Sequence, residues 1–180
     1  PQSCPPRTVP ALYRCGAGRG VSKMNNRVVG MACLLGALVA DQASKYWILD
    51  IYDLPARESV PLLPVLNLTM VWNHAITFGM LGGAGAAGRV IFSIAALLIV
   101  AGLGIWLART PWRWVAVALG LIMGGAIGNV IDRLRFGAVV DFIHAHAYGH
   151  SWPVFNIADA LIDCGVAILI IDNMRHRDAN

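Results

Sequence analysis

The stretch GGAIGNVIDRLRFGAVVDFIHAHAYGHSWPVFNIADALID, residues 124–163, decides how this chain is organised. It contains two apolar segments joined by a more polar connection, and a few polar side chains stand inside or beside the apolar parts. They are Asp132, Arg133, Asp141, Asn156, Asp159 and Asp163. An ionisable group in sequence apolar enough to enter a bilayer costs several kcal/mol unless it is paired or faces a polar cavity. These residues are therefore candidates for function.

The composition indicates a membrane protein. Of the 180 residues, 57% are hydrophobic and 13% charged, and the mean hydropathy is +0.62, which is outside the range of an ordinary soluble domain. The net charge is +4, but the basic residues lie scattered at segment ends, which indicates membrane orientation and not nucleic-acid binding. The four cysteines form no CxxC pattern, so we expect no disulfide framework, zinc site or cofactor.

Four apolar runs predict an α-helical membrane protein with transmembrane helices over residues 28–48, 89–107, 114–134 and 154–171. A secretory signal peptide is the alternative for the first run. Two features argue against cleavage. If the chain were cut after Ala40, Leu38 would stand where such cleavage sites have a small residue, and the apolar character resumes at Tyr46. We therefore expect an uncleaved span.

Basic residues at the ends of these runs predict the orientation. They are Lys23, Arg27, Arg109, Arg113, Arg175 and Arg177, and the four-span order places all of them on one side, which the positive-inside rule makes cytoplasmic. Both termini are then cytoplasmic, with a tail at 175–180. Residues 1–23, rich in Pro, Gly and Arg, are expected to be a disordered extension before Met24.

Residues 50–87 differ from the spans. Pro55, Pro61 and Pro64 break any helix, and residues 62–72 are rich in strand-forming side chains. We predict a small extramembrane β-unit over 50–87 and an outer loop over 135–153. A short amphipathic helix over residues 135–150 is an alternative for part of that loop.

This topology brings polar residues from distant parts of the sequence to one depth on the non-cytoplasmic side: Asp41, Asn73, Asn129, Asp132, Arg133, Asp141, Asn156 and Asp159. Two sets share a helical face. One is Gly125, Asn129 and Asp132, and the other is Asn156, Asp159 and Asp163. We expect the two faces to meet across a wet cavity. Asp132 and Arg133 are expected to neutralise each other and to fix the loop that follows.

Asp141 and Asp159 are the candidate catalytic pair. They lie 18 residues apart, and the loop between them is long enough to turn back. Two carboxylates close together cannot both ionise cheaply, so such a pair holds one proton near neutral pH. It can then do acid and base work on a single water, as in aspartic proteases. Asn129 and Asn156 are candidates to orient the pair or to bind a peptide backbone.

Other interpretations stay open. The histidines of the outer loop could join Asp141 in a metal site (His144, His146 and His150), although a surface loop without metal is favoured. Asp163, one turn deeper, could be a proton relay or make a hydrogen bond inside the bundle. The chain could also be a proton-coupled carrier, or an assembly factor without catalysis. A carrier needs polar residues along a path through the bilayer, whereas these crowd one face.

Five blocks make the chain resemble the lipoprotein signal peptidase (signal peptidase II) family, membrane aspartic proteases of bacteria. The resemblance runs over about residues 24–174, and the blocks are DQASK (41–45), NHAITFG (73–79), GGAIGNVIDR (124–133), VVDF (139–142) and FNIAD (155–159). In that family the aspartates of the last two blocks form the catalytic dyad, which implies Asp141 and Asp159. The family's supporting polar residues correspond to Asp41, Lys45, Asn73, Asn129, Asp132, Arg133 and Asn156.

The resemblance implies removal of signal peptides from prolipoproteins, by cleavage just before a cysteine that carries diacylglycerol, and sensitivity to globomycin-type cyclic peptides. It also implies four spans in the bacterial inner membrane, with cytoplasmic termini, and with the β-unit and the active site on the periplasmic face. One block departs from the family pattern: Ala75 stands where a glycine is usual. The departure concerns the local loop geometry.

Overall fold

The structure, a computed structural model, describes residues 25–74 and 85–177. The predicted extension at 1–23 and the glycine-rich end of the predicted β-unit lie outside these residues. The same is true of most of the block at 73–79, including Ala75.

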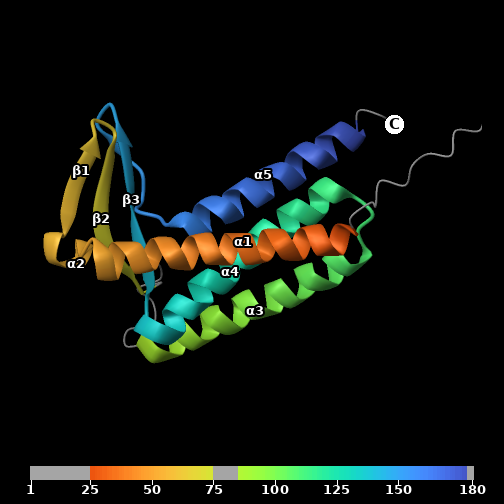
Figure 1. Cartoon of the computed structure of the whole chain (residues 1–180), viewed down its shortest axis with the longest axis horizontal. Helices are drawn as coiled ribbons and strands as arrows, with labels where there is room; N and C mark the ends of the chain where they lie inside the picture. Colours follow the sequence, from red (N-terminus) through yellow and green to blue (C-terminus); the bar gives the residue numbers. More distant parts are fainter. Residues whose placement is uncertain (1–24, 75–84, 178–180) are drawn as a thin grey trace, which may run out of the picture.

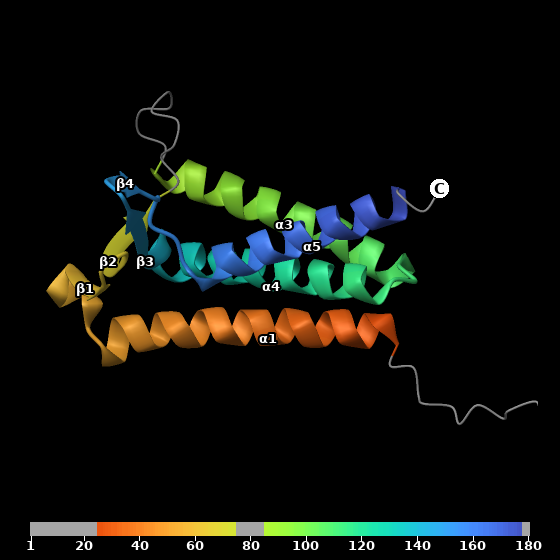
Figure 2. The same cartoon turned by 90° about the horizontal axis from the view of Figure 1, so that it is seen from above.

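Four long helices lie side by side: α1 (Asn26–Tyr46), α3 (Gly85–Arg109), α4 (Arg113–Phe136) and α5 (Ile157–Arg177) (Figures 1 and 2). The other three all contact α4, which is the most buried of the described helices that can cross a membrane. Among the described residues, three segments are long and apolar enough to cross a membrane: Asn26–Ile51, Ala87–Arg109 and Arg113–Phe136. The predicted class of helical membrane protein is confirmed. Helix α5 is not among the three because Asp159, Asp163 and Asp172 interrupt its apolar sequence.

Glycines let α4 approach both of its neighbours backbone to backbone. A Cβ added at Gly124 would lie 2.5 Å from the carbonyl oxygen of Leu34 on α1. A Cβ added at Gly125 would lie 2.6 Å from the carbonyl oxygen of Ala158 on α5. Small residues at helix interfaces are typical of membrane bundles because they allow this close packing. The two adjacent glycines therefore set how closely α1 and α5 approach α4.

A four-stranded antiparallel sheet lies at one end of the helices (Figure 1). Its strands, in spatial order, are β1 (Ser59–Leu63), β2 (Leu66–Asn73), β3 (Val139–Ala147) and β4 (His150–Ser151). In the β2–β3 pairing, Val71 lies opposite Asp141 and Asn73 opposite Val139. The sheet therefore joins a segment that follows α1 to the segment between α4 and α5.

This arrangement corrects two expectations. The sheet was predicted within residues 50–87 alone, with 135–153 as a connecting loop, but strands β3 and β4 come from that second segment. The alternative of an amphipathic helix over 135–150 is wrong, because α4 ends at Phe136 and β3 begins at Val139. An extended backbone wins here because β2 supplies a ladder of hydrogen-bond partners.

The end of α1 packs against the sheet. The helix continues as a short π-helix, η1 (Trp47–Ile51), and the chain then forms α2 (Leu54–Arg57) before β1. A buried apolar cluster joins these elements to β2 and β3; it consists of Ile48, Leu54, Leu68, Val140 and Phe142. Strand β3 is thereby fixed across the end of the bundle, which places Asp141 where α4 and α5 can reach it.

Candidate active site

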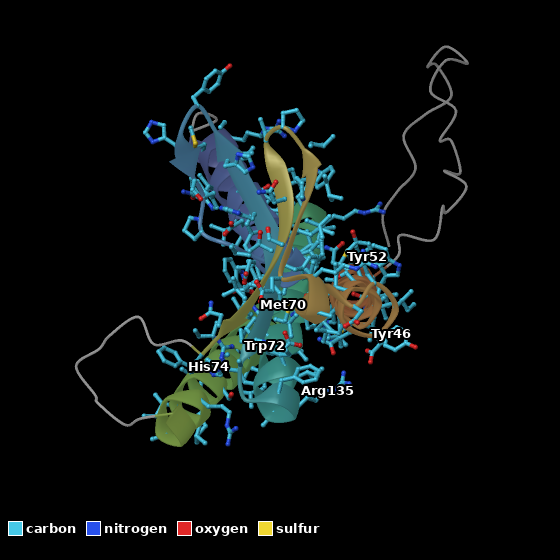
Figure 3. The ribbon with its side chains drawn as sticks, turned by 90° about the vertical axis from the view of Figure 1, so that its left-hand side faces the viewer. Tyr46, Tyr52, Met70, Trp72, His74 and Arg135 are labelled. Carbon is cyan, nitrogen blue, oxygen red and sulfur yellow. The ribbon has the colours of Figure 1, made fainter. Side chains whose placement is uncertain are left out.

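The predicted polar residues gather where the sheet meets the helices. Figure 3 views the molecule from this end: β2 crosses the ends of the helices, with Met70 and Trp72 near the middle of the view and Tyr46 on the α1 side. Five polar side chains at this junction are less than 3% exposed: Asp41, Lys45, Asp132, Asp141 and Asn156. Buried polar groups must be hydrogen-bonded, so their partners define the site.

Asp141 is held by two amide groups at the start of β3. Its side chain is 1% exposed. Oδ2 accepts a hydrogen bond from Nδ2 of Asn73 at 3.0 Å, and Oδ1 accepts one from Nδ2 of Asn156 at 2.6 Å. Burial raises the pKa of the Asp141 carboxyl from 3.8 to about 6, and the charge of Asp159 raises it further, while the two amide donors oppose the shift. The carboxyl therefore keeps its proton to a higher pH than an ordinary aspartate does.

Asp159 is fixed at the beginning of α5 by a reciprocal pair of hydrogen bonds. The backbone N–H of Asp159 donates to Oδ1 of Asn156 at 3.0 Å, and the backbone N–H of Asn156 donates to Oδ2 of Asp159 at 3.3 Å. This is the arrangement of a capping box, in which two residues three apart satisfy each other's free N–H groups. Oδ1 of Asp159 also accepts from Nδ2 of Asn129 at 2.9 Å. The carboxylate lies at the helix end whose dipole favours a negative charge.

Asn156 connects the two candidate catalytic carboxyls. Its side-chain NH2 donates to Asp141, and also to Oδ1 of Asn129 at 3.2 Å, while its backbone N–H and its side-chain oxygen serve Asp159. Every one of these partners was selected from the sequence, and the structure brings them into one hydrogen-bonded group.

Beside this group lies a buried ion cluster centred on Lys45. Its ammonium nitrogen is 2.9 Å from Oδ2 of Asp41, 2.6 Å from Oδ2 of Asp132 and 3.2 Å from Oδ1 of Asn129. A lysine has three N–H donors, and all three have an acceptor here. The cluster joins α1 to α4 and reaches the active-site group through Asn129.

The two acids of this cluster also position the elements that carry the candidate catalytic residues. Oδ2 of Asp132 accepts from the backbone N–H of Val140, next to Asp141 on β3, at 3.2 Å. Oδ1 of Asp41 accepts from the backbone N–H of Ala158, next to Asp159 on α5, at 3.0 Å. Each acid therefore holds the residue immediately before a candidate catalytic aspartate.

Gln42 belongs to this cluster and was not among the predicted site residues. Its side-chain nitrogen lies 3.1 Å from Oδ2 of Asp41, 3.1 Å from Oδ1 of Asp132 and 3.4 Å from the carbonyl oxygen of Gly128. Gln42 is neutral and follows Asp41 directly, so it does not lie on the helical face that Asp41 and Lys45 share at spacing i, i+4. Helical spacing therefore does not predict that Gln42 belongs to the cluster. Gly128 is required for close approach, since a Cβ there would collide with the carboxylate of Asp41.

One expectation about this region is wrong. Asp132 does not pair with Arg133, because its cation is Lys45; Nη1 of the Arg133 guanidinium donates to the carbonyl oxygen of Asn129 at 3.2 Å. The other part of that expectation holds, since Asp132 fixes the start of the following segment through Val140. Arg133 is half-buried and feels the charges of all three nearby acids, Asp132, Asp141 and Asp159.

Asp163 does not meet the other face residues. Its side chain is exposed, and it makes no hydrogen bond inside the described part of the bundle. The spacing from Asp159 correctly predicts a neighbouring position on α5, but the helix turns that position away from α4.

The histidines lie on the sheet, away from the carboxyl pair. Nε2 of His144 is 2.6 Å from Oγ of Ser151, and the rings of His144 and His146 are 5.7 Å apart between centroids. Within residues 25–74 and 85–177, no group of three or more His, Cys, Asp or Glu side chains is placed to hold a metal ion. Asp141 uses its two oxygens on amide donors instead.

The chain is similar to known proteins over most of its length. The family model described as signal peptidase (SPase) II matches residues 33–175. A relative from Methylobacterium sp. (strain 4-46), named lipoprotein signal peptidase, is 44% identical over 151 residues, which cover 84% of this chain and 92% of the relative. A relative of the same name from Methylorubrum extorquens (strain PA1) is 45% identical over 146 residues, covering 81% of this chain and 85% of the relative. A solved structure described as a bacterial membrane enzyme, at 2.3 Å resolution, has a TM-score of 0.69 and 30% identity, with 84% of this chain and 90% of that one covered.

Proposed function

The chain belongs to the signal peptidase II family, and on that premise we propose that Asp141 and Asp159 are the catalytic pair with which it removes signal peptides from prolipoproteins. It is a protease of the membrane, and the relatives that share more than 40% of its residues are named for lipoprotein processing. No similarity supports the proton-coupled carrier that the sequence left open.

The observation that carries this proposal is the shared partner of the two carboxyls. Asn156 donates to Asp141 from its side chain and to Asp159 from its backbone, so one residue fixes both groups at one end of the bundle. We assign the shared proton to Asp141, because burial raises the pKa of its carboxyl to about 6. Asp159, at the positive end of the α5 dipole, serves as the base.

The reaction then needs only these groups and one water. Asp159 takes a proton from the water as its oxygen attacks the scissile carbonyl carbon, and Asp141 gives its proton to the carbonyl oxygen. Collapse of the tetrahedral intermediate breaks the C–N bond, and the proton held by Asp159 passes to the leaving amine. One hydroxyl of the intermediate gives its proton back to Asp141 as the carboxyl group of the product forms.

Arg133 supplies positive charge close to the pair. Asn73, Asn129 and Asn156 orient the carboxyls, and Asp41, Lys45 and Asp132 hold their supporting elements.

The membrane arrangement follows from charge. Arg109, Arg113 and Arg175 lie at the ends of α3, α4 and α5 that are far from the sheet (Figure 1). By the positive-inside rule that end is cytoplasmic, as are both termini, and the carboxyl pair lies at the periplasmic face. We take α5 as the fourth span, because it is 21 residues long and packs along α4.

A site at this boundary suits a lipid-modified substrate. The acyl chains of a diacylglyceryl cysteine remain in the bilayer while the peptide bond before that cysteine reaches Asp141. A globomycin-type cyclic peptide is expected to occupy the same place, and no cofactor takes part.

The test is cleavage of a diacylglyceryl-modified prolipoprotein by the purified protein. Asp141→Asn and Asp159→Asn should each abolish cleavage while the protein stays folded. Asp50→Asn, which removes an exposed carboxylate near the same end of the bundle, is the matched control and should keep full activity. Full activity in either dyad variant refutes the proposal. A carrier would move protons without cleavage, and an assembly factor would do neither.

A further inference from the structure

Asp163 is a carboxylate on the apolar part of α5 that the carboxyl pair does not use. It lies one helical turn after Asp159, its side chain is exposed, and it has no hydrogen-bond or ion-pair partner among the described residues. An unpaired carboxylate facing lipid costs several kcal/mol, so such a residue usually meets a polar partner or a hydrated path. The structure shows no such partner within residues 25–74 and 85–177.

The side of α5 that carries Asp163 is continuous with the active site. Asp159, Asp163, Val166 and Ile170 are spaced i, i+4, i+7 and i+11, so they form one stripe along the helix. Val166 is 41% exposed and Ile170 is 54% exposed, whereas Gly165, which faces α4, is buried. Helix α5 lies at one side of the bundle (Figure 1). An open surface therefore begins at Asp159 and runs toward the far end of the helix.

The substrate is the molecule that must pass this surface. On the proposed function, a signal peptide whose scissile bond lies at Asp159 would enter the bilayer from there, and the exposed Val166 and Ile170 are open to its apolar part. One turn of α5 rises about 5.4 Å, which matches about two residues of extended peptide or about four of a helix. Close to the scissile bond the peptide must unwind to expose that bond. Its freed backbone N–H groups then lack partners in a medium without water.

We propose that Asp163 is a specificity-determining residue that accepts a hydrogen bond from the signal peptide about two to four residues before the scissile bond. The donor is a backbone N–H freed by unwinding, or the hydroxyl of a serine or threonine at that position. The inference rests on the proposed function, because it takes Asp159 as the point at which the bond is cut. It explains why a second charged residue stands between Asp159 and the apolar part of the stripe.

A kinetic experiment tests this role. Asp163→Leu and Asp163→Asn are compared with the unchanged protein on two diacylglyceryl-prolipoproteins that differ only by serine or alanine at the third residue before the cysteine. A lost hydrogen bond to a charged group predicts that Asp163→Leu raises KM about tenfold with kcat nearly unchanged. It should also lose the preference for serine. Asp163→Asn, which can still accept a hydrogen bond, should lose less. Cys164→Ala, on the next residue, is the matched control and should change neither constant.

Cross-linking gives a second readout that does not depend on turnover. Two proteins are compared, both carrying Asp141→Asn. In the first, Asp163→Cys is the only cysteine, because the native cysteines are replaced by alanine. In the second, the exposed Cys164 is the only cysteine that remains. The substrate carries one free cysteine two, three or four residues before its lipid-modified cysteine, whose sulfur is already in a thioether. Disulfide formation should favour position 163 strongly over position 164.

An unchanged KM, or cross-linking that fails to favour position 163 over 164, overturns the inference. The first result would mean that Asp163 faces only lipid or bound water, and the second that another molecule covers this stripe. Failure of the proposed function looks different. In that case Asp159→Asn still cleaves, whereas the present inference can fail while both dyad variants remain inactive.

Discussion

The side-chain nitrogen of Asn156 lies 2.6 Å from Oδ1 of Asp141 and comes from the residue that caps the helix carrying Asp159. One asparagine thereby has two tasks. As a helix cap it fixes the beginning of α5, and as an amide donor it fixes a carboxyl on β3. The geometry of the pair and the stability of α5 are consequently coupled, and substitutions of different shape should separate them.

Asn156→Ala should lose both tasks. Removal of an N-cap side chain costs about 1 kcal/mol of stability, and loss of a preorganised donor typically lowers kcat about 100-fold or more. Asn156→Ser should keep the cap, because serine is a good N-cap residue, but its side chain is too short to reach Asp141. Thermal unfolding in detergent and cleavage rates should therefore diverge: the serine variant stays close to the unchanged protein in Tm and close to Asn156→Ala in kcat. Near-normal kcat in Asn156→Ser would contradict the role of the amide.

Lys45 should be essential for folding and not only for activity. Lys45→Met leaves Asp41 and Asp132 buried without their cation, and breaking a buried ion pair from one side typically costs about 3–5 kcal/mol. The free energy of unfolding, measured in detergent, should fall by about this amount. Addition of Asp132→Asn to Lys45→Met should recover part of the loss, since one of the two unpaired charges is then removed. A double variant less stable than Lys45→Met alone would argue against this account.

Much of the helical framework follows from the sequence because it depends on local patterns. Hydropathy predicts the four long helices, and their bounds in the structure differ from the predicted spans by one to four residues, except that α5 runs six residues further, to Arg177. The isolated acids in apolar sequence mark the buried polar groups, because an ionisable group in such a place is costly unless it is paired. Lys45 was expected from the family resemblance alone. The nine residues selected as the site all lie at the junction of the sheet and the bundle.

The sheet was only half predictable, because its partners are distant in sequence. Strand β3 pairs with β2, which precedes it by about 70 residues, and no local pattern reports that pairing. The mistaken Asp132–Arg133 pair has a similar cause. Neighbours in sequence on a helix point about 100° apart, so the cation that meets Asp132 comes from α1, not from the adjacent residue. Exposure of Asp163 likewise depends on which side of α5 faces α4.

The glycines of α4 give a prediction with a control inside the same bundle. Gly124→Ala should push α4 away from Leu34, and Gly125→Ala should push it away from Ala158, each at a cost of about 1–3 kcal/mol from overpacking. Gly125→Ala should also lower activity, because it moves α5 and with it Asp159. On α3, Gly102 and Gly104 have nothing within 4 Å of an added Cβ.

Gly102→Ala and Gly104→Ala should therefore cause no loss of Tm, and a gain of up to about 1 kcal/mol is expected from better helix propensity. The measurement is thermal unfolding of the four single variants under identical detergent conditions. Equal effects at all four positions would show that the α4 contacts do not set the helix spacing.

The buried carboxyl of Asp141 should make the fold less stable as the pH rises. Its pKa is raised from 3.8 to about 6, mainly by burial, so the folded protein binds this proton more tightly than the unfolded chain. Between these two values each increase in pH removes stability, and above about pH 6 the full penalty, about 3 kcal/mol, is present.

Asp141→Asn removes the charge but keeps an acceptor oxygen for Asn156. The free energy of unfolding of Asp141→Asn, minus that of the unchanged protein, should therefore be higher at pH 8 than at pH 4. The loss of the second acceptor oxygen changes this difference by the same amount at both pH values. Unfolding free energies at the two pH values check this, with the exposed Asp50→Asn as a control that should show no such gain. A difference that stays constant with pH, or that is larger at pH 4, would mean that the carboxyl is not held against its charge. If the expected gain is found, the residue proposed to carry the shared proton is one that weakens the fold at neutral pH, as is common for groups kept for activity.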